Sequence, residues 1–134
     1  MRTRRAVLPV VAVTLSCACA YAYYGVVGPR MKARLTVTRM RSVATMIAAA
    51  VAPIDPRKLE AQIAAEGNSA LLLDGWGNRL AINIANSGGA LGYSVRSLGR
   101  DGIEGTCCQR VSGTDWDVDA VFENGEWRQV WRVP

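Results

Sequence analysis

Acidic side chains gather in one polar segment near the carboxyl end of the chain. Asp101 opens this segment, and the run Thr114-Asp-Trp-Asp-Val-Asp119 closes it. Carboxylate and carbonyl oxygens in a flexible loop are hard ligands, which suit Ca²⁺ and offer little to softer metals. Aspartates beside glycines are also common in solvated turns. The segment therefore has two interpretations, a calcium loop or a set of solvated turn aspartates.

A second calcium pattern exists by spacing alone. Four acidic residues match the ligand offsets of an EF-hand loop: Asp115, Asp117, Asp119 and Glu126. Ala120 stands where that loop needs a glycine, and Asn124-Gly125 predicts a hairpin where an EF-hand needs a helix. The EF-hand interpretation is therefore rejected.

The chain lacks the residue type on which many hydrolytic and zinc-dependent sites depend. The chain of 134 residues has no histidine, which removes the usual general base, the usual zinc ligand and the Ser-His and Cys-His dyads. Cys17 and Cys19 lie in an apolar run, whereas Cys107 and Cys108 are adjacent in a polar loop, and neither spacing predicts a zinc site. We predict that the protein is not an enzyme, and that Cys107 and Cys108 are dispensable for folding, whether reduced, in a vicinal disulfide or paired between chains.

Two helices are expected ahead of the acidic segment. Over residues 30–52, apolar side chains recur at steps of three and four and predict an amphipathic helix: Met40, Val43, Ala44, Ile47, Ala48 and Val51. We expect this apolar stripe to pack on the chain's own sheet, the alternative being a groove for a partner. A short helix is predicted over 56–66, with Asp55 as its N-cap and Pro56 in its first turn.

Residues 70–134 are expected to form a small antiparallel sheet with its loops. The stretch 79–85 alternates as a half-buried strand, and 91–97 forms a second strand after the turn Asn86-Ser-Gly-Gly89. Asn124-Gly125 predicts a two-residue hairpin turn. This turn would place Glu123 opposite Glu126, Phe122 opposite Trp127, Ala120 opposite Gln129 and Val118 opposite Trp131.

The excess of basic over acidic residues lies in the first third of the chain. The formal net charge is +5, and every acidic residue lies at or beyond Asp55. A protein that binds nucleic acid would place basic and aromatic side chains together on its folded domain, and the aromatic carboxyl-terminal part lacks such a cluster. We predict no nucleic-acid partner.

Two glycine-rich motifs are the most specific features of the chain. They are Asp74-Gly-Trp-Gly-Asn78 and Tyr93-Ser-Val-Arg-Ser-Leu-Gly-Arg-Asp-Gly102. Together they resemble the carboxyl-terminal half of the major pseudopilin of type II secretion systems, whose run is Asp-Pro-Trp-Gly-Asn, a strand, then Tyr-x-x-x-Ser-Leu-Gly-x-Asp-Gly. Here Gly75 replaces the proline. We expect Trp76 to pack beneath this loop, with Gly75 and Gly77 letting backbone approach its ring.

The resemblance also implies a calcium ion and its ligands. In these pseudopilins the ion is held by the leucine carbonyl of Ser-Leu-Gly, by the aspartate three residues later and by an aspartate near the end of the loop. The matching positions here are Leu98 and Asp101. The later ligand is either Asp115 or Asp117.

The amino-terminal residues predict a link to a membrane. Residues 6–27 are uncharged and long enough to cross about 30 Å of hydrocarbon as a helix, behind a basic cap at residues 2–5. We predict a membrane anchor over 1–28 and a periplasmic pseudopilin-like domain over 29–134. The small residues of Cys17-Ala-Cys-Ala20 leave a cleaved signal peptide open, and Thr14-Leu-Ser-Cys17 leaves a lipoprotein open.

These expectations together define a fold class and a function. The predicted fold is α+β and pilin-like, with a long amino-terminal helix, half membrane-spanning and half amphipathic, packed on a small antiparallel sheet. The resemblance implies a structural part of a type II secretion or pilus-like machine, with other pseudopilins, machine proteins or copies of itself as partners. It would be a single-pass inner-membrane protein with its carboxyl-terminal domain in the periplasm.

The start of the chain also supports an alternative function. Pilin-like proteins have a glycine at a leader cleavage site, then an apolar helix that starts with phenylalanine and bears an early glutamate. In this chain no glycine precedes the apolar run, and residues 6–27 contain no acidic residue. The alternative is a stand-alone, membrane-anchored periplasmic binding module whose pilin-like domain does not enter a filament.

Overall fold

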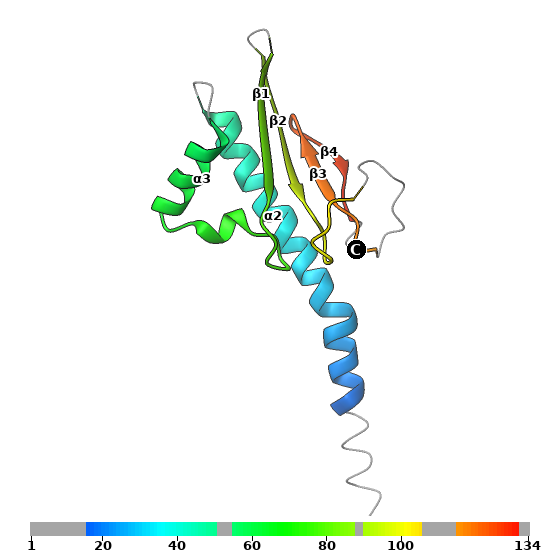
Figure 1. Cartoon of the computed structure of the whole chain (residues 1–134). Helices are drawn as coiled ribbons and strands as arrows, with labels where there is room; N and C mark the ends of the chain where they lie inside the picture. Colours follow the sequence, from blue (N-terminus) through cyan, green and yellow to red (C-terminus); the bar gives the residue numbers. More distant parts are fainter. Residues whose placement is uncertain (1–15, 51–54, 88–89, 106–114, 132–134) are drawn as a thin grey trace, which may run out of the picture. The chain divides into compact units, whose positions relative to one another are not determined.

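The computed structural model describes residues 16–50, 55–87, 90–105 and 115–131 (Figure 1). The chain divides into two compact units, Met1–Met31 and Lys32–Pro134. In the first unit, residues 16–22 are helical and lead into a π-helical turn, η1 (Tyr23–Val27), and then into the start of α2 (Gly28–Ala49). Cys107 and Cys108 lie outside the described residues.

The membrane-spanning half of the predicted amino-terminal helix is not supported. Within the described ranges, no helix combines the length and the apolar character needed to cross a membrane. The predicted fold class is corrected on this point, and so is the single-pass inner-membrane location that depended on it. Residues 1–15 of the predicted anchor lie outside the described residues.

The second unit contains a four-stranded antiparallel sheet (Figure 1). Its strands are β1 (Ala81–Ser87), β2 (Ala90–Ser97), β3 (Ala120–Glu123) and β4 (Glu126–Gln129), in the order β1-β2-β3-β4. Each strand therefore pairs with its neighbour along the chain. β1 and β2 pair antiparallel, as predicted, but Ser87 pairs with Ala90, so their turn is shorter than the predicted four residues.

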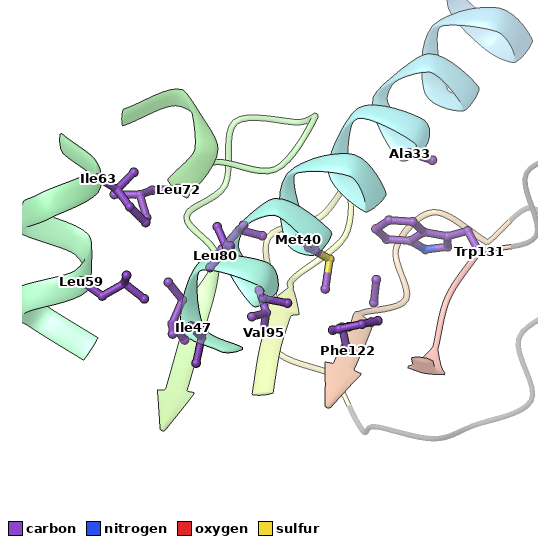
Figure 2. Packing of buried hydrophobic residues seen from close by; sticks show 14 of the residues in the cluster. Ala33, Met40, Ile47, Leu59, Ile63, Leu72, Leu80, Val95, Phe122 and Trp131 are labelled. Atoms are coloured by element: carbon purple, nitrogen blue, oxygen red, sulfur yellow. The ribbon is translucent and has the colours of Figure 1, made fainter. Parts of the chain in front are cut away.

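The apolar stripe of α2 packs on this sheet. Met40, Val43, Ala44 and Ile47 are buried, whereas Ala48 is exposed and Val51 lies outside the described residues. Figure 2 shows Met40 and Ile47 on the side of α2 that faces β2 and β3, which carry Val95 and Phe122. Leu80 and Ile82 belong to the same buried cluster. The prediction that the stripe packs on the chain's own sheet is confirmed.

The short second helix, α3 (Pro56–Ala65), begins at its expected cap. Asp55 Oδ1 accepts a hydrogen bond from the backbone N–H of Arg57 at 2.9 Å. Leu59 and Ile63 turn inward to the core, one helical turn apart. The chain then passes through a 3₁₀ turn, η2 (Ser69–Leu72), to the first glycine motif.

The Asn124-Gly125 turn confirms half of the predicted hairpin register. Both residues have positive φ, 48° and 90°, and Phe122 pairs with Trp127 as expected. A bulge between Val121 and Phe122 then shifts the pairing, so that Val121 and not Ala120 lies opposite Gln129. The predicted register beyond the bulge is wrong because one extra residue in a strand moves every later pair.

Candidate functional site

The first glycine motif is a tight turn around one buried carboxylate. The Asp74 side chain is only 1% exposed. Its Oδ1 accepts hydrogen bonds from the backbone N–H groups of Trp76, at 2.9 Å, and Asn78, at 2.8 Å. The Asp74 N–H donates to the Asn78 carbonyl at 2.7 Å. The motif is therefore a closed turn whose aspartate satisfies its own backbone.

The second motif docks on the other oxygen of the same carboxylate. Ser97 Oγ donates to Asp74 Oδ2 at 2.8 Å, and Asn78 Nδ2 donates to the Gly99 carbonyl at 2.7 Å. A Cβ on Gly102 would lie 3.0 Å from Asn78 Oδ1. Residues far apart in the sequence thus form one hydrogen-bonded unit, residues 74–78 with 97–102, which we call the Asp74 junction.

Helix α2 is fastened to the Asp74 junction at Gly75. The Gly75 N–H donates to the buried Thr36 Oγ1 at 2.7 Å, and Arg39 Nη1 donates to the Asp74 carbonyl at 3.0 Å. A Cβ on Gly75 would lie 2.1 Å from the Lys32 carbonyl oxygen. Gly75 therefore admits the helix backbone, which differs from the expected role of admitting backbone to the Trp76 ring. A proline here would also lack the N–H that Thr36 receives.

Trp76 packs among other tryptophans, as predicted for a core side chain. Its ring centroid lies 5.0 Å from that of Trp131 in an edge arrangement and 6.4 Å from that of Trp116. Trp131 Nε1 donates to the Val118 carbonyl at 2.9 Å. This cluster joins the first motif to the end of the acidic segment.

Asp117, one of the predicted metal ligands, is already paired with an arginine. Arg100 Nε donates to Asp117 Oδ1 at 2.7 Å, and Arg100 Nη2 donates to Oδ2 at 2.6 Å. These hydrogen bonds, with the attraction of the two charges, lower the pKa of Asp117 and raise that of Arg100. Both oxygens of Asp117 are therefore engaged.

The other predicted ligands are not gathered around a common point. Asp101 Oδ1 accepts from the Ile103 N–H at 3.0 Å, Asp115 Oδ1 accepts from the Asp117 N–H at 3.3 Å, and both side chains are exposed. Leu98 is half-buried within the Asp74 junction. Across the part of the chain that the structure describes, no cluster of three or more carboxylate, cysteine or histidine side chains is placed to hold a metal.

Asp119 is the functional candidate that sequence reasoning missed. Its side chain is buried, 1% exposed, and its Oδ2 accepts from the Gly105 N–H at 3.1 Å with Arg96 Nη1 at 3.7 Å. Its Oδ1 has no hydrogen-bond partner among the residues that the structure describes. Burial raises the pKa of Asp119, and the negative charges of Asp101 and Glu104 act in the same direction. Such a carboxylate favours a proton or a cation.

A separate candidate surface lies in the first unit. Large apolar side chains are exposed there, including Tyr21, 78% exposed, and Tyr24, 76% exposed, with Tyr23, Val26, Val27 and Met31. Cys17 and Cys19 are exposed on the same helix. A concentration of exposed apolar side chains is typical of a protein contact surface.

Comparison of the chain with protein-family models, with curated proteins and with solved structures found no match.

Proposed function

We propose that the chain is a structural subunit of a type II secretion or pilus-like machine, acting through protein contacts and not by catalysis. The single observation that carries this proposal is the Asp74 junction. The two motifs that resemble the pseudopilin pattern bond to each other through Asp74 with Ser97 and through Asn78 with Gly99. Motifs that matched by chance would have no reason to share one buried carboxylate.

The contact surface proposed for assembly is the exposed apolar face of residues 16–31. Tyr21, Tyr23 and Tyr24 each keep more than half of their surface in water. Burying a large apolar side chain contributes about 1.5–3 kcal/mol, so covering several of them would stabilise an assembly. The proposed partners are other pseudopilins, further machine proteins or copies of the chain.

Calcium is proposed as the ion of the acidic segment, with a changed ligand set. We assign the later carboxylate to Asp119, because its Oδ1 is buried without a partner among the described residues, whereas Asp117 is engaged by Arg100. Asp101 and the Leu98 carbonyl remain the ligands implied by the resemblance. Calcium accepts such a mixture of carboxylate and carbonyl oxygens, and when bound it would engage Asp119 Oδ1.

Oxidative crosslinking tests the assembly proposal, because Cys17 and Cys19 are exposed on the helix concerned. The protein would carry Cys107→Ser and Cys108→Ser, in cells with an active type II secretion machine. We expect disulfide-linked products with pilin-like subunits, identified by mass spectrometry, and their loss in Cys17→Ser, Cys19→Ser.

The matched control has no native cysteine and carries Ala65→Cys, at an exposed site at the end of α3. Products as abundant in this control as at Cys17 and Cys19 would contradict assembly through the helix. No products at all, together with an intact amino terminus, would favour the stand-alone binding module.

A further inference from the structure

Helix α2 and the β3–β4 hairpin border an apolar groove on the second unit. It consists of two adjoining hollows of about 440 and 410 Å³, which share Arg41 and Trp127. The apolar surface is contributed by Val37 of α2 and by sheet residues that include Tyr93, Phe122, Trp127 and Val130. We call this the α2–β4 groove.

The charge of the α2–β4 groove has one sign. Arg34 and Arg41 are the charged residues that line the two hollows, and no carboxylate among the described residues lines either. The Arg41 guanidinium carbon lies 5.8 Å from the centroid of the Trp127 ring, a cation–π arrangement. A guanidinium against a ring keeps a fork of N–H donors for a carboxylate. The groove therefore offers an aromatic surface beside an anion-binding group.

The helix of a second copy does not fit this groove by charge. Residues 1–54 contain no aspartate or glutamate, while Arg30, Lys32, Arg34, Arg39 and Arg41 crowd the helical segment. Placing that helix on Arg34 and Arg41 would bring like charges together, which disfavours an interface.

We infer that the α2–β4 groove docks an acidic segment of a different protein, because the chain's own acidic run is already engaged: Trp116 and Asp119 are buried and Asp117 is paired with Arg100. A carboxylate of that segment pairs with Arg41, and an adjacent apolar side chain lies on Trp127 and Tyr93. The groove belongs to the second unit, so this inference stands apart from the assembly surface of residues 16–31 and does not depend on the proposed machine.

The probe is a short fluorescent peptide in which glutamate alternates with leucine and phenylalanine, and the control peptide has lysine for each glutamate. Binding to the full chain is followed by fluorescence anisotropy. We expect the acidic peptide to bind and the lysine peptide not to bind. The double variant Arg34→Glu, Arg41→Glu should lower the affinity for the acidic peptide by about tenfold or more. The same variant should bind the lysine peptide.

The matched control is Arg57→Glu, Lys58→Glu, which makes the same charge change at exposed sites on α3. It should bind the acidic peptide as the unaltered chain does. In an NMR titration, the indole N–H signal of Trp127 should shift while that of Trp76 stays in place. Thermal unfolding of both charge-reversal variants checks that the fold persists.

Three results would overturn the inference. The first is that the acidic peptide does not bind, and the second is that the α3 control loses binding equally. The third is that the indole N–H signal of Trp76 shifts while that of Trp127 does not. Self-association in sedimentation that Arg34→Glu, Arg41→Glu abolishes would assign the groove to a second copy and would equally overturn it.

Discussion

Asp74 and Asp119 are both buried carboxylates, each 1% exposed, in opposite surroundings. Asp74 accepts from the N–H groups of Trp76 and Asn78 and from Ser97 Oγ, so both of its oxygens are occupied. Asp119 accepts from one N–H, and its Oδ1 has no partner among the described residues. The Asp74 junction is closed by the protein itself, whereas Asp119 Oδ1 has no such partner among the described residues, which favours a proton or a cation there.

The difference separates a carboxylate that stabilises the fold, Asp74, from one that we propose binds an ion, Asp119. The residues that match the pseudopilin pattern best bind one another and position the fold. Asp119, whose Oδ1 has no partner in the described part of the chain, lies beyond those motifs, at the end of the acidic segment. The hydrogen-bonded turn at Asp74 therefore positions the fold, and the ion proposed for the acidic segment would bind at Asp119.

The largest effect is expected from Asp74→Ala. The substitution leaves the N–H groups of Trp76 and Asn78 and the Ser97 hydroxyl without their acceptor, and unsatisfied buried donors are costly. We expect the free energy of unfolding in urea to fall by roughly 3–5 kcal/mol. An Asp74→Ala loss no larger than that of Asp119→Ala would erase the distinction between the two carboxylates.

Gly75→Ala should have the next largest effect. Its Cβ would meet the Lys32 carbonyl oxygen at 2.1 Å, so α2 has to move away from the Asp74 junction. We expect a loss of about 3 kcal/mol in the same urea experiment. Gly92→Ala is the matched control, because a Cβ there meets nothing closer than 3.5 Å. Equal losses at Gly75 and Gly92 would argue against the close approach of α2.

The pH dependence of stability should distinguish Asp119 in the absence of calcium. Its pKa is raised above the ordinary value of 3.8 by burial, so the folded state holds the proton more tightly than the unfolded state. The stabilising contribution is complete below 3.8 and is lost as the pH rises through the raised pKa. In the wild type, Asp119 should make the free energy of unfolding lower at neutral pH than at acidic pH. Asp119→Asn should abolish this part of the difference. A wild-type profile unchanged by the substitution would show that Asp119 does not titrate in this way.

Asp117→Asn should have the smallest effect. The side chains of Arg100 and Asp117 are 54% and 40% exposed, and solvent screens an exposed ion pair. We expect a loss of at most about 1 kcal/mol in urea unfolding. The pKa of Asp117 is lowered, so its contribution is present above 3.8 and is lost as the pH falls, which is opposite to Asp119. A larger loss than in Asp119→Ala would make Asp117 the more important carboxylate.

Features fixed by neighbouring residues could be predicted from the sequence. The Asp55 cap, the apolar stripe of α2 and the Asn124-Gly125 turn each depend on residues within a few positions of one another. The bulge at Val121 left no such local signal, and the register beyond it was wrong. The contact of Gly75 with Lys32 depends on how two distant segments meet, so the sequence indicates that the glycine matters but not that it contacts Lys32.

The choice among the aspartates could not be made from the sequence. Asp115, Asp117 and Asp119 are spaced two residues apart, so strand alternation gives all three the same predicted face. Of the three, only Asp119 is buried, and it directly precedes β3, which begins at Ala120. Arg100 and Asp117 pair across the loop, and nothing in their spacing indicates this.

Thermal unfolding with calcium and with a chelator tests the central claim most directly, namely that Asp119, whose buried Oδ1 has no partner among the described residues, takes part in binding the ion. Calcium well above its dissociation constant should raise the Tm of the wild type by about 5 °C or more. Asp117→Asn should respond in the same way, while Asp119→Asn and Asp101→Ala should not respond. Identical wild-type curves with calcium and with chelator, or an undiminished response in Asp119→Asn, would contradict the account.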